Sequence, residues 1–185
     1  MTTTASAELL GPLFSTRRML EIFSDAARLQ GMLDFEAALA GAEAAAGLVP
    51  RDAAAAIAAA CRAELYDPAL LAREAESAGN LAIPLVNALT AAVARADPAA
   101  ARHVHRGATS QDVQDTGLVL QLRRGLAVLE GDLARLSAAL AALAERHRGT
   151  PMAGRTWLQQ AAPVTLGLKA AGWLSAIERH RRRVR

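Results

Sequence analysis

The feature that most constrains the fold of this sequence is a run of apolar residues at heptad spacing. The intervals between them alternate between three and four residues, which places them along one side of a single α-helix, as in the seam of a coiled coil. The run comprises Val119, Leu122, Leu126, Leu129, Leu133, Leu136, Leu140 and Leu143. Thr109 and Ser110 can cap the start of this helix, and Gly149-Thr150-Pro151 follows its end.

The expected helix, over about residues 109–148, spans ~60 Å at about 1.5 Å per residue. The shorter helices before it cannot cover so long a seam, so we expect other long helices to pack on it, from the same chain or from further copies. A monomer would expose a longer apolar stripe than soluble monomers usually tolerate. The seam therefore predicts a homo-oligomer.

The rest of the sequence also favours helix, because it is rich in alanine and leucine and only 3% of it is aromatic. No segment shows the strict alternation of a strand. Residues 1–15 are expected to be a loose lead-in. Shorter helices are expected over about residues 16–26, 28–46, 53–65, 68–78 and 84–95, with one more turn from Asp97-Pro98 and a last helix from Pro163 to the chain end. The predicted fold class is all-α, with residues 1–108 as a small helical N-terminal domain and residues 109–185 as the beginning of a central helical bundle.

Charge and cysteine content narrow the classes of partner. The formal net charge is +3, and residues 179–185 hold five arginines and a histidine. Such a run is compatible with a nucleic-acid patch, but no aromatic residue interleaves with it to stack on bases, so a solvated helix face is the preferred interpretation. Cys61 is the single cysteine. With no signal peptide and no stretch long and apolar enough for a membrane span, we expect a cytoplasmic protein without nucleic-acid or membrane partners.

The most informative polar segment is residues 105–112, at the start of the long helix. It combines His105, Gly107, two hydroxyls at Thr109 and Ser110, and a helix N-terminus. Backbone N–H groups point out of a helix start and the helix dipole favours an anion there. We interpret these parts, with the glycine allowing close approach, as a carboxylate-binding site.

A purely structural interpretation of the same residues stays open. Thr109 and Asp112 have the spacing of a capping box, which by itself only stabilises a helix start. His103 and His105 have no third histidine or cysteine at ligand spacing, so a zinc site is not expected. A histidine that donates to a substrate anion or carries a proton is the preferred interpretation of His105.

A second polar segment, residues 154–159, lies in a region flanked by glycine and proline that we expect to be a loop. Arg155 can clamp a carboxylate through two parallel hydrogen bonds, although a surface arginine is the alternative. Gln159 and Gln160 can orient a substrate. Gly79-Asn80 is a weaker third break, which by itself is a helix C-cap.

These segments resemble the fumarase/aspartase superfamily, over a region from about residue 14 to the last residue. Residues 105–116 read His-Arg-Gly-Ala-Thr-Ser-Gln-Asp-Val-Gln-Asp-Thr, which is similar to the first signature region of that superfamily. Residues 154–161, Gly-Arg-Thr-Trp-Leu-Gln-Gln-Ala, resemble its carboxymuconate cycloisomerase branch. Residues 78–86 and 167–174 add support.

Trp157 distinguishes between branches of the superfamily. Adenylosuccinate lyase and its relatives have a histidine at the matching position, and they have an Arg/His-Asp pair where this sequence has Gly79-Asn80. Both differences favour the cycloisomerase branch. Arg106 departs from the tryptophan or phenylalanine expected there, which adds a cation near the substrate.

The resemblance implies a reaction without a cofactor or metal. A carboxylate oxygen of 3-carboxy-cis,cis-muconate adds across a conjugated double bond, a proton goes to the neighbouring carbon, and 4-carboxymuconolactone forms, in aromatic (protocatechuate) catabolism. The carbanion is stabilised as an aci-carboxylate, so positive potential must gather around the carboxylates. The implied substrate-binding residues are Asn80, His105, Arg106, Thr109, Ser110, Arg155, Thr156, Trp157 and Gln159.

The resemblance also implies that this chain is less than half of a family member. The loop Gly-Ser-Ser-x-Met-Pro-x-Lys-x-Asn-Pro, whose serine transfers the proton, is absent from the sequence, and the chain reaches Arg185 within a helical pattern. We therefore expect an incomplete N-terminal part that is inactive alone, from a tetramer whose active sites each use three subunits. A fumarate-releasing lyase like adenylosuccinate lyase and a non-catalytic assembly fragment are the alternatives.

Overall fold

The computed structural model describes residues 11–185, so the part of the expected lead-in before residue 11 lies outside the described residues. The chain is predominantly helical, as predicted, and it forms two compact units that meet within α7 (Ser110–Arg146), between Arg124 and Gly125. This division reflects which residues pack together, and it does not test where one domain ends and the next begins. The predicted domain boundary between residues 108 and 109 stays a prediction.

The first unit gathers short helices before the start of α7. In chain order they are α1 (Gly11–Phe14), α2 (Arg17–Ile22), α3 (Asp25–Ala45), α4 (Arg51–Ala60), the 3₁₀ turn η1 (Ala63–Leu65), α5 (Pro68–Ala78), α6 (Ala82–Ala96) and the 3₁₀ turn η2 (Ala100–His103). The ends follow local chemistry that the sequence shows. Thr16 caps α2, Asp67 caps α5 with Pro68 in its first turn, and Gly79 ends α5 at a φ of 74°.

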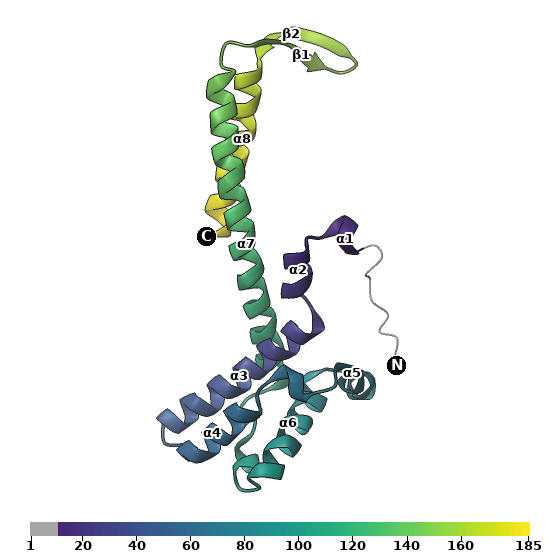
Figure 1. Ribbon diagram of the computed structural model, residues 1–185, viewed down its shortest axis with the longest axis vertical. Helices are drawn as coiled ribbons and strands as arrows, with labels where there is room; N and C mark the ends of the chain where they lie inside the picture. The colour runs from purple at the N-terminus through teal and green to yellow at the C-terminus, as the bar shows by residue number, and fades with distance from the viewer. Residues whose placement is uncertain (1–10) are drawn as a thin grey trace. The chain divides into compact units, whose positions relative to one another are not determined.

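The core of the first unit lies between α3, α4 and α6, which Figure 1 shows packed together. α3 contributes large side chains, of which Met32 and Leu33 are 1% and 0% exposed. α4 contributes small ones, such as Ala53 and Ala54, so its backbone can approach α3 closely. Leu85 and Leu89 of α6 are fully buried. Each buried leucine stabilises the fold by about 1.5–3 kcal/mol.

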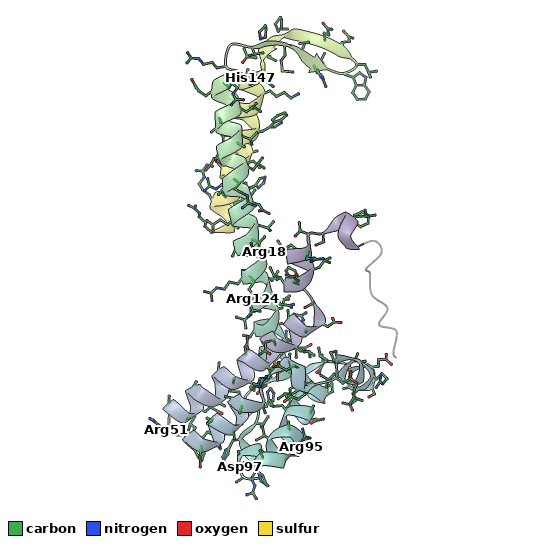
Figure 2. All side chains as sticks on the ribbon, viewed as in Figure 1. Arg18, Arg51, Arg95, Asp97, Arg124 and His147 are labelled. Atoms are coloured by element: carbon green, nitrogen blue, oxygen red, sulfur yellow. The ribbon has the colours of Figure 1, made fainter. Side chains whose placement is uncertain are left out.

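α3 crosses the start of α7 where two glycines meet. A β-carbon on Gly31 would lie 3.0 Å from the carbonyl oxygen of Gly117, so the two backbones are nearly in contact. Farther along α7, the side-chain amide of Gln121 donates to the carbonyl oxygen of Ile22 at 2.9 Å. The guanidinium of Arg124, which is labelled in Figure 2, lies 3.7 Å from the Asp34 carboxylate. These contacts fix the end of α2 and α3 against the part of α7 that follows the first polar segment.

The second unit consists of the rest of α7, a β-hairpin and α8 (Leu166–Val184), which runs back along α7 in the opposite direction (Figure 1). Ser137 of α7 donates to Glu178 of α8, and Arg185 donates to Glu130 at 2.6 Å. His147 lies where α7 meets the hairpin (Figure 2), and its carbonyl oxygen accepts from the amide of Gly167 at 2.9 Å.

The prediction of a fold without strands is wrong for residues 151–165. β1 (Pro151–Thr156) and β2 (Gln159–Thr165) form an antiparallel pair with an irregularity between Ala153 and Gly154. Strict alternation appears in a strand when one of its faces is buried. Most residues of both strands are exposed in this chain, so the sequence carries no such alternation. Pro163 consequently lies in β2, and the last helix begins at Leu166 rather than at Pro163.

The other predicted boundaries shift by several residues. Residues 11–14, expected to be loose, form α1, and α4 ends at Ala60, after which the chain turns through η1. The long helix begins at Ser110 as predicted and ends at Arg146. Along its seam Leu140 is buried, whereas Leu126, Leu129 and Leu136 are 42–44% exposed. In the described part of the chain, no helix is both long and apolar enough to cross a membrane.

Candidate functional site

The start of α7 is built by a reciprocal cap. The backbone amide of Thr109 donates to Oδ2 of Asp112 at 2.8 Å, and the amide of Asp112 donates to the Thr109 hydroxyl at 3.4 Å. The Thr109 hydroxyl also donates to Asp112 at 3.1 Å. The predicted capping box is therefore present. The Thr109 and Asp112 side chains hold the helix start in place. The amides of the first turn have no intrahelical acceptors, so they remain directed out of the helix.

The loop before this cap has an unusual backbone. Gly107 has a φ of 70° and His105 has a φ of 54°. A positive φ is uncommon for a residue other than glycine. A β-carbon on Gly107 would meet no protein atom within 4 Å, so the expected close approach of a bound carboxylate to this glycine stays a prediction. The positive φ is what favours glycine at this position. For His105 the same backbone region is sparsely populated and costs about 1–3 kcal/mol, so the surroundings must hold the residue there.

His105 is held by a buried carboxylate that the sequence reasoning did not assign to the site. Nδ1 of His105 lies 2.6 Å from Oε1 of Glu36, a residue of α3 that is 1% exposed. Burial raises the pKa of Glu36 above its ordinary value of 4.5, and the His105 hydrogen bond counteracts part of that rise. A signal for Glu36 exists in the sequence, since it shares a helical face with the buried residues Leu33 and Ala40, where a charged residue is unusual.

Asn80 occupies a different place in the first unit. Its side-chain oxygen accepts from the amide of Ile83 at 3.0 Å, so it caps the first turn of α6. The carboxamide NH₂ group of Asn80 is not used by that bond. Within the described residues no hydrogen bond joins Asn80 to residues 105–112.

The second polar segment is exposed on the hairpin rather than in a loop before a helix. Arg155 pairs in register with Gln160, and Thr156 pairs with Gln159. Trp157 and Leu158 form the tip, where they are 85% and 91% exposed. Leu158 has a φ of 56°, so the second of the two turn residues takes the left-handed backbone, as in a type II turn.

A cavity of about 460 Å³ lies beside the hairpin, within the second unit. It is lined mainly by small and apolar side chains, together with Arg155 and Lys169. Nζ of Lys169 also lies 5.4 Å from the centre of the Trp173 ring, a cation–π arrangement. Two cations beside an apolar wall suit an anionic, partly apolar ligand such as a carboxylate.

The predicted site residues thus form two groups, one in each unit. His105, Arg106, Thr109 and Ser110 follow one another in the first unit, to which Asn80 also belongs. Arg155, Thr156, Trp157 and Gln159 share the hairpin of the second unit. Among residues 11–185, no cluster of three or more His, Cys, Asp or Glu side chains could hold a metal ion.

The arginines near residue 185 have acceptors close by. Arg181 donates to Glu178 at 2.7 Å, Arg179 donates to the Ser175 hydroxyl at 2.8 Å, and Arg185 is paired with Glu130. These bonds suit a solvated helix face.

Comparison with known families gives the class of this chain. The family described as Lyase matches residues 14–185, so the chain belongs to that family. This result agrees with the resemblance to the fumarase/aspartase superfamily.

Individual relatives narrow the comparison further. The chain is 62% identical over 178 residues to 3-carboxy-cis,cis-muconate cycloisomerase of Pseudomonas aeruginosa, which covers 96% of this chain and 39% of the relative. It is 49% identical over 175 residues to nitrosuccinate lyase of Streptomyces davaonensis, covering 95% of this chain and 37% of that enzyme.

A solved structure of the same kind of enzyme also matches this chain. The crystal structure of 3-carboxy-cis,cis-muconate lactonizing enzyme from Pseudomonas putida matches with a TM-score of 0.93 at 59% identity, over 96% of this chain and 40% of that one. The chain therefore spans about two fifths of the length of these relatives.

Proposed function

We propose that the protein to which these residues belong is a cycloisomerase that lactonises 3-carboxy-cis,cis-muconate to 4-carboxymuconolactone. The observation that carries this proposal is the 62% identity to the Pseudomonas aeruginosa cycloisomerase, with a backbone that follows the Pseudomonas putida enzyme at a TM-score of 0.93. The polar groups described above suit a substrate with three carboxylates.

The first unit supplies one set of carboxylate-binding groups. The start of α7 presents backbone amides and the positive end of the helix dipole, next to Ser110. Since Nδ1 of His105 faces Glu36, Nε2 is the nitrogen left to face a substrate carboxylate, to which the protonated imidazolium can donate. Arg106, which is exposed, adds a second cation to the same loop.

The second unit supplies the other set. Arg155 presents its guanidinium to a carboxylate, and Thr156 and Gln159, paired across the hairpin, orient the diene. Trp157 provides an apolar face for the conjugated carbons. Substrate carbon deprotonation and its reverse pass through an aci-carboxylate, and these cations stabilise the charge that develops on it. The proton-transferring serine belongs to a loop that these residues do not contain.

We also propose that the protein works as a homotetramer in the cytoplasm. Support for assembly comes from the seam of α7, where Leu126, Leu129 and Leu136 leave more than two fifths of their surface exposed. Solvent-exposed leucines at heptad spacing suit packing against further long helices.

A hybrid enzyme tests the proposed reaction. Residues 1–185 are joined to the remaining part of the Pseudomonas aeruginosa cycloisomerase, and loss of diene absorbance is followed with 3-carboxy-cis,cis-muconate. We expect the hybrid to turn the substrate over and residues 1–185 alone not to. A folded hybrid without lactonisation, beside an active parent enzyme, contradicts the proposal.

Arg155→Ala in the hybrid tests the carboxylate clamp. Losing a charge-assisted hydrogen bond costs about 1.5–3 kcal/mol, so we expect kcat/KM to fall about 10- to 100-fold or more. Arg95→Ala, at an exposed arginine of α6, is the matched control. Equal effects of the two substitutions contradict the role of Arg155.

The second candidate function is a lyase, favoured by the 49% identity to nitrosuccinate lyase. Elimination and addition share the same carbanion chemistry, so the same polar groups would serve. Trp157, where adenylosuccinate lyase has a histidine, disfavours the purine substrate. We expect neither the hybrid nor its Trp157→His variant to cleave adenylosuccinate.

A further inference from the structure

Among the residues of α3 that are buried, Glu36 is the only charged one. Its neighbours along the same helical face are Leu29, Met32, Leu33 and Ala40, all 2% exposed or less. One carboxylate oxygen, Oε1, contacts Nδ1 of His105 at 2.6 Å, and the other, Oε2, is buried without a hydrogen-bond partner.

This arrangement is poorly suited to a purely stabilising role. Burying a carboxylate is costly unless both oxygens are satisfied, and here one is not. An apolar residue at position 36 would avoid that cost. The unfavourable burial is therefore better explained by what the carboxylate does to His105, a residue 69 positions away in the sequence.

The effect on His105 follows from the chemistry of the two groups. An ionised carboxylate has no proton to donate, so Nδ1 of His105 must carry the proton that the two atoms share. Nε2 is then the free nitrogen of the ring. The same bond also holds His105 at its positive φ of 54°, next to Gly107 and the start of α7.

We propose that Glu36 is a positioning residue that fixes the proton of His105 on Nδ1 and so directs Nε2 to the substrate. The part of this statement that concerns the substrate rests on the proposed function. When the ring takes up a second proton, on Nε2, the imidazolium beside an ionised Glu36 donates to a substrate carboxylate, and when Nε2 is unprotonated it can accept a proton. No bond is made or broken in Glu36 itself.

Nitrogen NMR on the ¹⁵N-histidine-labelled chain tests this inference without any reaction. Above the pH range in which histidine titrates, a ring locked by Glu36 shows a protonated Nδ1 and an unprotonated Nε2. The His105→Asn variant assigns the signals among the four histidines. We expect this pattern in the unsubstituted chain. A proton on Nε2, or two averaged nitrogens, overturns the inference even if no variant can be made.

Two variants of α3 separate positioning from general structural effects. Glu36→Gln keeps the shape but not the charge, and we expect the two nitrogen shifts of His105 to move towards each other as the tautomers mix. Glu43→Gln, two turns along the same helix, is the matched control and should leave the His105 pattern unchanged. An unchanged pattern in a folded Glu36→Gln chain also overturns the inference.

Failure of the proposed function is distinguishable from failure of this inference. A locked His105 with an inactive hybrid enzyme contradicts the proposed function alone, because the NMR pattern needs no substrate. An active hybrid with an unlocked His105 contradicts the role of Glu36 alone.

Discussion

Gly117 of α7 lies so close to Met32 of α3 that a β-carbon on Gly117 would approach Cγ of Met32 to 2.9 Å and its backbone nitrogen to 3.1 Å. The side chain of Met32 can shift, but its backbone nitrogen belongs to the centre of α3. Any side chain at position 117 must therefore move the two helices apart, and with them Glu36 and the first turn of α7.

Gly117→Ala is accordingly expected to destabilise the chain. Overpacking at a helix crossing costs about 1–3 kcal/mol, which outweighs the gain of about 1 kcal/mol from the better helix propensity of alanine. Urea unfolding followed by circular dichroism measures the difference. Gly131→Ala is the control on the same helix, where the nearest atom to a β-carbon is the flexible Arg135 guanidinium at 3.8 Å. We expect the control to be neutral or stabilising, and a stabilising Gly117→Ala contradicts the crossing.

The stability of the chain should depend on pH through Glu36. Because its pKa is raised above 4.5, mainly by burial, the folded chain keeps the Glu36 proton to a higher pH than the unfolded chain does. The contribution of this group to stability is thus complete below about pH 4.5 and is lost as the pH rises through the raised pKa. The carboxyl of Glu43 adds to the rise, and His105 opposes it.

The matched measurement compares the unsubstituted chain with Glu36→Gln, which cannot ionise. The free energy of unfolding of the unsubstituted chain, relative to that of the variant, should fall between pH 4.5 and neutral pH. A relative free energy that rises over this range would show that Glu36 is stabilised as a carboxylate, with a lowered pKa.

Glu36 should also influence substrate binding in the hybrid enzyme. If it directs Nε2 of His105 towards a substrate carboxylate, Glu36→Gln should raise KM about 10-fold or more, while Glu43→Gln should not. A change confined to kcat, with KM unaltered, would assign His105 to proton transfer instead of carboxylate binding.

The thiol of Cys61 should be unreactive in the folded chain. It is 5% exposed, and burial, together with the carboxylates of Glu36 and Asp34, raises its pKa to about 12. Only the thiolate reacts with disulfide reagents. We expect labelling at neutral pH to be at least about 100-fold slower in the folded chain than in denaturant. Comparable rates would mean that the core around α4 opens readily.

The exposed seam of α7 should drive self-association. Replacing Leu129 and Leu136 with aspartate puts charges into the apolar stripe, and we expect the assembly to dissociate in light-scattering measurements. Leu118→Asp, at a 37% exposed leucine outside the heptad run, is the matched control on the same helix. A monodisperse monomer of the unsubstituted chain would contradict the assembly itself.

Local signals predicted much of this fold. The heptad run predicted α7, Thr109 with Asp112 predicted the cap, and Asp67-Pro68 with Gly79 predicted both ends of α5. The hairpin was missed because most residues of its strands are exposed and its turn uses Leu158 at a positive φ, where glycine or asparagine would have been the signal. A local sequence pattern does not predict a hairpin whose strands are mostly exposed and whose turn lacks these residues.

The candidate site was predicted less completely than the fold. Glu36 was missed because its role depends on a partner 69 residues away, and no local pattern reports that distance. The positive φ of Gly107 was not predicted, because a sequence does not distinguish a glycine needed for its backbone conformation from one needed for close approach. The binding roles of the remaining site residues stay predictions, since they concern a substrate.

The most direct test of the central claim is the choice of substrate by the hybrid enzyme, measured as kcat/KM for 3-carboxy-cis,cis-muconate and for nitrosuccinate side by side. Residues 1–185 carry Trp157, Arg155 and the start of α7, so they should impose the cycloisomerase preference. We expect lactonisation to exceed nitrite release from nitrosuccinate by at least about 100-fold, the discrimination that a few charge-assisted hydrogen bonds provide. Nitrite release that equals or exceeds lactonisation contradicts the account and assigns the chain to a lyase.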